Sequence, residues 1–141
     1  MPVEIVRTQP GEIAAFVRSS ECEALHALYG FRVVWHEQRH DFAATDDGRV
    51  IGAATIRIAA SLAHVETLIV APERRLAGFG RRLLEHAADV GNYYNCHKMS
   101  VLVPHCSGTQ QFFERCGYRE EAVLPQHTFK CDVAVLRKFL L

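Results

Sequence analysis

The sequence has no net charge, no long basic block and no long apolar run. Its 16 Lys and Arg residues balance 16 Asp and Glu residues. Without a basic block, a nucleic acid is not expected as the main partner. No apolar stretch approaches the roughly 18 residues of a membrane-spanning helix. The first five residues, Met-Pro-Val-Glu-Ile, resemble no secretory signal. We therefore expect a cytoplasmic protein with no nucleic-acid or membrane partner.

Closely spaced cysteine pairs are also missing. The five cysteines are widely scattered, at positions 22, 96, 106, 116 and 131. In a chain without a secretion signal they are expected to be free thiols. Cys96-His97 and His105-Cys106 contain ligand types that zinc uses, but zinc sites usually show Cys-x-x-Cys-type spacing. We therefore expect no metal site.

Length and composition predict one domain. The chain has 141 residues, 49% of them hydrophobic, and no repeat or linker. That length is near the commonest domain size and is too short for two domains. We expect residues 1–141 to fold as a single domain.

Hydrophobic patterning predicts a mixture of strands and helices. The expected strands are residues 3–6, 31–35, 41–45, 50–58, 64–70, 98–103 and about 129–136. The expected helices begin at Pro10-Gly11 and end at Gly30, span about 79–89, and span about 109–116. Asp46-Asp47-Gly48 predicts a hairpin turn, and Ser107 with Gln110 predicts a capping box.

The order of these elements predicts a mixed sheet. Consecutive strands joined by short turns are antiparallel, whereas the segment from 64 to 103 is a strand-helix-strand crossover whose two strands should be parallel. We therefore expect an α+β fold.

A glycine-containing turn between strand and helix is the strongest functional signal. Residues 68–84 read LIVAPERRLAGFGRRLL, in which Arg75-x-x-Gly78-x-Gly80 opens the helix. Backbone N–H groups at a helix N-terminus bind anions, and glycine lets an anion approach them closely. The dinucleotide fingerprint and the P-loop are both excluded, because Leu83 stands where the third glycine belongs and no Gly-Lys-Ser/Thr triplet exists.

These residues resemble the GNAT acyltransferases, which transfer an acyl group from acyl-coenzyme A to an amine. Arg75, Gly78 and Gly80 match the family's pyrophosphate loop, Gln/Arg-x-x-Gly-x-Gly/Ala, and residues 112–118 resemble its short aromatic helix closed by Gly-Tyr. The resemblance covers about residues 45–120. It implies a single domain with a mixed, mostly antiparallel sheet, helices on both faces and one crossover whose strands splay apart around the pantetheine arm.

The resemblance implies acetyl-coenzyme A as co-substrate and a set of cofactor-binding residues. Arg74 and Arg82 are further cations within reach of the phosphates, and the main-chain groups of residues 68–70 are expected to stabilise the oxyanion. The expected cofactor-binding residues are Leu68, Ile69, Val70, Arg75, Leu76, Ala77, Gly78, Phe79, Gly80, Arg81, Cys106, Phe112 and Phe113.

His64 and Glu66 are the candidate catalytic residues. An amine with a pKa near 10 must lose a proton before it attacks a thioester, so a base is required. The two residues share one face of the expected strand, where family members carry a glutamate or paired histidines. His64 titrates in the required range without help, whereas Glu66 would need a raised pKa.

Two positions depart from the family pattern. Phe113 stands where the family usually has a tyrosine that protonates the leaving thiolate, and Cys106 stands where it often has asparagine. Either the thiolate leaves unaided, or Tyr118, Tyr93 or Tyr94 substitutes.

The sequence thus predicts an N-acetyltransferase that acts by direct transfer on a primary amine, with a small molecule favoured. Acetylation of protein N-termini or lysines, and a non-catalytic acyl-coenzyme A-binding module, remain alternatives. The apolar tail Phe139-Leu140-Leu141 is compatible with a homodimer.

Overall fold

A computed structural model describes residues 2–140, which fall into two compact units, one ending at His36 and one beginning at Glu37. Each unit is described by itself. That residues 1–141 fold as a single domain remains a prediction.

The N-terminal unit contains one helix, α1 (Ala14–Tyr29), which confirms the predicted helix with a later start. Gly30 ends it in the left-handed conformation at φ 78° and donates its N–H to the His26 carbonyl, as glycine commonly does at helix ends. The strands predicted at 3–6 and 31–35 are wrong, since residues 2–9 and 32–37 form neither helix nor strand. A strand needs a hydrogen-bonded neighbour, which alternation of apolar residues does not supply.

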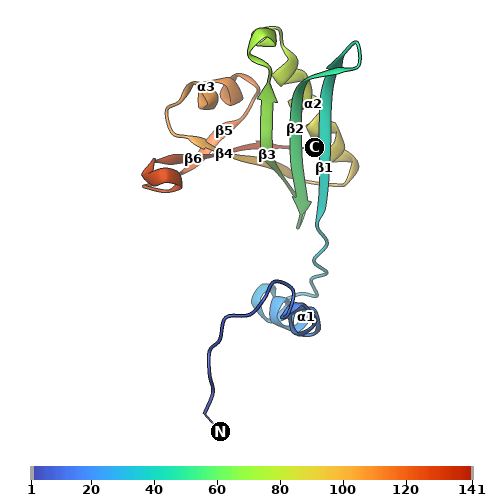
Figure 1. Cartoon of the computed structure of the whole chain (residues 1–141), viewed down its shortest axis with the longest axis vertical. Coiled ribbons are helices and arrows are strands. Elements are labelled where there is room, and N and C mark those ends of the chain that lie inside the picture. The colour runs from blue at the N-terminus through green and yellow to red at the C-terminus, as the bar shows by residue number, and fades with distance from the viewer. Residues whose placement is uncertain (1, 141) are drawn as a thin grey trace. The chain divides into compact units, whose positions relative to one another are not determined.

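The second unit is built on a six-stranded sheet in the order β1-β2-β3-β4-β6-β5 (Figure 1). The strands are β1 (Gln38–Asp46), β2 (Arg49–Ala59), β3 (Leu62–Val70), β4 (Lys98–Pro104), β5 (Arg119–Leu124) and β6 (Val133–Phe139). Four neighbouring pairs are antiparallel, and β3 and β4 are parallel. Helix α2 (Phe79–Tyr93) connects these two strands. The α+β fold with one parallel crossover is confirmed.

The β1–β2 hairpin also confirms its predicted turn. Asp47 and Gly48 connect the strands with φ angles of 52° and 78°. Two positive φ angles characterise the turn that best matches the twist of a two-residue hairpin, and Gly48 adopts its angle without strain.

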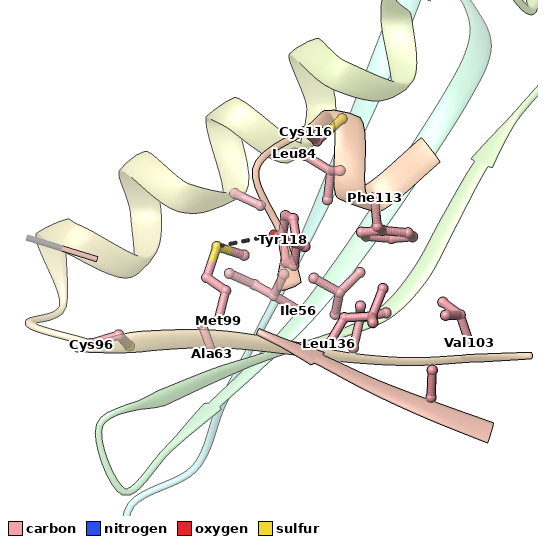
Figure 2. Packing of buried hydrophobic residues seen from close by; sticks show 14 of the residues in the cluster. Ile56, Ala63, Leu84, Cys96, Met99, Val103, Phe113, Cys116, Tyr118 and Leu136 are labelled. Carbon is pink, nitrogen blue, oxygen red and sulfur yellow. Dashed lines mark hydrogen bonds between the residues drawn. The ribbon is translucent and has the colours of Figure 1, made fainter. Parts of the chain in front are cut away.

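Helices α2 and α3 (Gly108–Arg115) pack on the same face of the sheet and enclose its core. Figure 2 shows Leu84 of α2 and Phe113 of α3 above Ile56, Met99 and Leu136 of the strands. Ile56, Met99 and Leu136 are fully buried. The side chains at the alternate positions of the same strands lie on the opposite face of the sheet.

Ser107 caps α3 as predicted, but Gln110 completes the motif differently. The Ser107 hydroxyl accepts a hydrogen bond from the Gln110 N–H at 3.1 Å. The Gln110 amide oxygen accepts from the Cys106 N–H at 2.7 Å, one residue before the expected partner. The amide group donates to Glu120 at 2.9 Å, which ties α3 to β5.

Strand β5 was not predicted from the sequence. It is an edge strand, and Glu120 and Glu121 interrupt the apolar alternation by which a strand is recognised. The last strand lies later than predicted, because residues Thr128–Lys130 form a 3-10 turn before β6.

The C-terminal tail is less exposed than predicted. Leu140 packs against the core, Phe139 is exposed, and Leu141 lies outside the described residues. Phe139 and Leu140 therefore do not form one continuous exposed apolar surface. A homodimer that uses this tail remains a prediction.

The parallel strands diverge after a short contact. Only Leu62, Ala63 and His64 of β3 pair with β4, opposite Lys98, Met99 and Ser100. In Figure 1, β4 and β6 run across the direction of β3. Beyond His64, the edge of β3 that faces β4 has no ladder, so its main-chain polar groups are available to a ligand.

Candidate active site

A cavity of about 500 Å³ lies where β3, the turn before α2, and α3 meet. It contains most of the predicted cofactor-binding residues but not Ala77 or Cys106. Its lining residues are Leu68, Ile69, Val70, Arg74, Arg75, Leu76, Gly78, Phe79, Gly80, Arg81, Gly108, Thr109, Phe112, Phe113 and Arg115.

The N-terminus of α2 opens into this cavity without a side-chain cap. Gly78 is the N-cap residue, in the left-handed conformation at φ 85°, and the first turn contains no acidic side chain. The first N–H groups of a helix lack intrahelical partners and carry the positive end of its dipole. The turn is therefore suited to an anionic group, as the sequence predicted.

Gly80 is required by packing as well as by ligand access. A Cβ atom at this position would lie 3.0 Å from the ring of Phe112 and 3.8 Å from Val70. A larger residue would displace Phe112, which itself lines the cavity. This glycine therefore allows α2 and α3 to approach each other closely.

The arginines around the cavity have different roles. The Arg75 Nε donates to the Val70 carbonyl at 3.1 Å, which fixes the turn to the end of β3. The Arg81 guanidinium donates to the Arg115 carbonyl at 3.1 Å and so connects α2 to the end of α3. Arg74 forms an ion pair with Asp46 of β1.

Arg115 is a further cation of the cavity that the sequence did not indicate. It lies 40 positions after Arg75 in the sequence, and only the packing of α3 against α2 places it beside the turn. Its position two residues after Phe112-Phe113 was only a weak signal of a place in the cavity. An arginine on a short helix is usually exposed to solvent.

His64 lies at the point where β3 and β4 separate. Its Nδ1 is 2.9 Å from the hydroxyl of Ser100, which pairs with it across the strands and is buried. In the tautomer in which Nδ1–H donates to Ser100, Nε2 holds the lone pair that accepts a proton. Burial, and then the nearby Arg57 guanidinium, lower the pKa of His64, while Glu66 acts in the opposite direction. Burial and Arg57 thus favour the neutral imidazole, the form that can accept a proton.

Glu66 lies on the same face as His64 but is held by two cations. Its carboxylate is 2.6 Å from the Arg39 guanidinium and 3.5 Å from the Arg57 guanidinium. It is the extra residue of a bulge, because Val65 pairs with Ile56 while Thr67 pairs with Thr55. Bulges re-aim side chains, and this one directs Glu66 toward the arginines. His64 is accordingly the better placed base.

The titration of His64 gives a direct check of these contacts. Replacing Arg57 by glutamine removes a positive neighbour and should raise the pKa of His64, whereas Glu66→Gln should lower it. NMR titration of the histidine ring measures both. Shifts of the same sign in the two variants would contradict the described electrostatics, and Arg49→Gln serves as the control for loss of a surface arginine.

None of the three candidate tyrosines lines the cavity beside Phe113. Tyr118 is buried, its hydroxyl donates to the Met99 sulfur at 3.6 Å (Figure 2), and burial followed by Cys116 raises its pKa. Tyr93 and Tyr94 lie at the C-terminal end of α2, and neither lines the cavity. Phe113 itself is buried and lines the cavity, where it excludes water but donates no proton.

Cys106 occupies the turn between β4 and α3, in the left-handed conformation at φ 58°. Its sulfur lies 3.6 Å from both ring nitrogens of His105, an arrangement in which the thiol packs over the ring face. His105 in turn contacts Glu120 at 3.2 Å. The cofactor contact predicted for Cys106 therefore remains a prediction.

A comparison with protein families identifies the fold. The model of the acetyltransferase (GNAT) family matches residues 7–118. The chain belongs to the GNAT family. Members of this family use acetyl-coenzyme A as co-substrate, which agrees with a cavity formed at the helix N-terminus and along the free edge of β3.

Solved acetyltransferase structures share this GNAT fold at low sequence identity. A putative acetyltransferase from Agrobacterium tumefaciens matches 99% of this chain and 100% of its own, with a TM-score of 0.73 and 18% identity. An acetyltransferase from Bacillus cereus matches 97% of this chain and 98% of its own, with a TM-score of 0.77 and 16% identity. At such identities these structures establish the fold alone.

A curated relative is the glucosamine 6-phosphate N-acetyltransferase of Trypanosoma brucei brucei. It is 26% identical over 85 residues, which are 55% of this chain and 56% of the relative. The chain thus spans just over half of that protein's length.

Two further properties of residues 2–140 concern metals and membranes. Within this range no three His, Cys, Asp or Glu residues come together as a metal-binding group. Nor does any helix of the same residues reach the length and apolarity needed to cross a membrane.

Proposed function

We propose that this GNAT protein transfers an acetyl group from acetyl-coenzyme A to a primary amine of a small molecule, with His64 as general base. The observation that carries the proposal is the position of a histidine, hydrogen-bonded to Ser100, at the divergence of β3 and β4, on the strand whose far end lines a cavity suited to the cofactor.

The cofactor's phosphates bind the main-chain N–H groups from Gly78 onward, with Arg75 and Arg115 adding positive charge. The pantetheine arm follows the free edge of β3 over residues 68–70, between Val70 and the aromatic residues of α3. This path directs the thioester toward His64. Because Arg81 already connects α2 to α3, its guanidinium supports the walls of the cavity more than it binds phosphate.

The reaction needs a proton acceptor and an oxyanion site. Nε2 of His64 accepts a proton from the ammonium form of the amine, directly or through one water molecule, and the amine then attacks the thioester carbon. Main-chain N–H groups of residues 68–70 hydrogen-bond the oxyanion that forms. Collapse of the intermediate breaks the C–S bond and releases the coenzyme A thiolate, and the nitrogen loses its extra proton to solvent, which leaves the neutral acetamide.

The thiolate leaves without a tyrosine donor. A free thiol has a pKa of about 8 to 9, so its anion is a tolerable leaving group near neutral pH. The burial of Phe113 and the position of Tyr118 in the core agree with this unaided departure.

A small-molecule acceptor is favoured because the chain is short and carries no long charged block that would dock a protein. The curated relative acts on glucosamine 6-phosphate by its name, and this amino sugar therefore belongs among the first acceptors to test. An acetyltransferase structure with the same fold is named for the alanine of ribosomal protein S18. A peptide with a free N-terminus is therefore a second acceptor to test.

The proposal is tested by incubating the protein with acetyl-coenzyme A and a panel of amines while thiol release is followed. Thiol release that depends on an added amine, with the acetylated amine identified by mass spectrometry, is the expected result. Binding of acetyl-coenzyme A without amine-dependent release would instead identify a binding module. Preference for the peptide over all small amines would assign a protein substrate.

A further inference from the structure

Four side chains form one row across the face of the sheet opposite α2 and α3. Arg39 of β1 pairs in register with Arg57 of β2, and Arg57 pairs with His64 of β3. His64 then pairs with Ser100 of β4. Because neighbouring strands lie about 4.8 Å apart, Arg57 is beside the histidine and Arg39 is one strand further away. Two guanidinium groups therefore lie close to the candidate base.

Two carboxylates form ion pairs with these arginines. Glu66 contacts Arg39 at 2.6 Å and Arg57 at 3.5 Å, and Glu37 contacts Arg57 at 3.5 Å. Glu66 belongs to β3, the strand of His64, whereas both arginines belong to β1 and β2. The row thus places a proton-accepting imidazole one strand away from a guanidinium group that keeps further N–H donors, which complements a molecule with an ammonium group and an anionic group.

The arginines retain capacity for a ligand. A guanidinium group has five N–H donors, and the ion pairs described use only Nη2 of Arg39 and Nε of Arg57. The two side chains are 64% and 47% exposed. Ion pairs this exposed contribute little to folding stability, so their removal should leave the fold intact.

We infer that the acceptor carries an anionic group, a phosphate or a carboxylate, that binds Arg57 and Arg39 while its amine faces His64. This inference rests on the function proposed above and adds the chemical class of the substrate. The imidazole of His64 receives the amine, and the arginines fix the other end of the acceptor. Acceptors without the anion lack one of the two anchors.

Two matched pairs of acceptors test the inference in the thiol-release assay. The first pair is 3-aminopropyl phosphate and 3-aminopropan-1-ol, and the second is 4-aminobutyrate and butylamine. With the parent protein, the anionic member of at least one pair should show a kcat/KM higher by about tenfold or more, the usual effect of a charged hydrogen bond. The pair with the larger preference identifies the anion as phosphate or carboxylate.

Arg57→Gln should raise KM for the anionic acceptor and so lower the anionic-to-neutral ratio of kcat/KM, because the accompanying shift in the pKa of His64 acts on both acceptors alike and cancels in that ratio. Arg57→Lys should restore part of the preference, and Arg49→Gln, outside the row, should leave it intact. Equal kcat/KM values within both pairs, or an equal loss for both members in Arg57→Gln, would overturn the inference while the transferase activity remained. No thiol release from any of the four amines would contradict the proposed function itself.

Discussion

Replacing His64 by alanine should lower the turnover of acetyl transfer by roughly a hundredfold or more, the usual contribution of a general base. The affinity for acetyl-coenzyme A should barely change, because the cavity lining does not include His64. The effect is expected in kcat, since proton removal belongs to the chemical step and not to cofactor binding. Steady-state kinetics with a responsive amine, combined with calorimetric binding of coenzyme A, measure the two quantities separately.

His40→Ala is the matched control for this variant. His40 is also a partly buried histidine of the sheet, but it pairs with Ile56 on the core-facing side and hydrogen-bonds Gln38. Its loss should leave turnover near that of the parent. A nearly unchanged rate in His64→Ala, together with a hundredfold loss in Glu66→Ala, would transfer the role of base to Glu66.

Gly78→Val should abolish or severely weaken the binding of coenzyme A. The residue at position 78 has a φ angle of 85°, which valine adopts only with strain, and its side chain would extend from a residue that lines the cavity into open space where the ligand is expected. Loss of even one hydrogen bond to a charged phosphate costs roughly 1.5–3 kcal/mol, which is about tenfold or more in affinity. Calorimetry with coenzyme A gives the affinity.

Gly30→Val separates ligand access from backbone strain. Gly30 has nearly the same backbone angles, φ 78° and ψ 9° against φ 85° and ψ 6°, and a Cβ atom meets nothing within 4 Å at either position. Both variants should therefore lose comparable stability in thermal unfolding, while only Gly78→Val loses the ligand. Unchanged affinity in a folded Gly78→Val protein would refute the pyrophosphate assignment.

The conformation of the proposed cofactor turn was predictable because its signal is local. The angle that favours glycine at position 78, the proline that ends the strand and the amphipathic helix that follows all fall within 17 consecutive residues. The hairpin turn at Asp47-Gly48 and the helix end at Gly30 were predictable for the same reason. In each case the conformation depends on the residues of the turn themselves.

The rest of the site depends on strand register, which no local pattern specifies. Arg57 and His64 become neighbours only through the β2–β3 pairing, and the bulge at Glu66 turns its side chain toward Arg39 and Arg57. The assignment of residues 31–35 as a strand was wrong for a related reason, since an apolar alternation does not show which partner will pair with it.

The charged edge strand β5 was missed because solvent-facing glutamates conceal its alternation. The tyrosine at position 118 could not be excluded as a proton donor until packing placed its hydroxyl against Met99. Both outcomes reflect contacts between segments that are distant in the sequence.

The most direct test of the account is an NMR titration of the isotopically labelled protein with coenzyme A. The account predicts that the backbone amides of Gly78, Phe79 and Gly80 shift most, together with those of residues 68–70 on the free edge of β3. The amides of β5 and of the Asp47-Gly48 turn should remain unaffected. Saturable shifts centred away from the start of α2, or the absence of any shift at high coenzyme A concentration, would contradict the assignment of this cavity as the cofactor site.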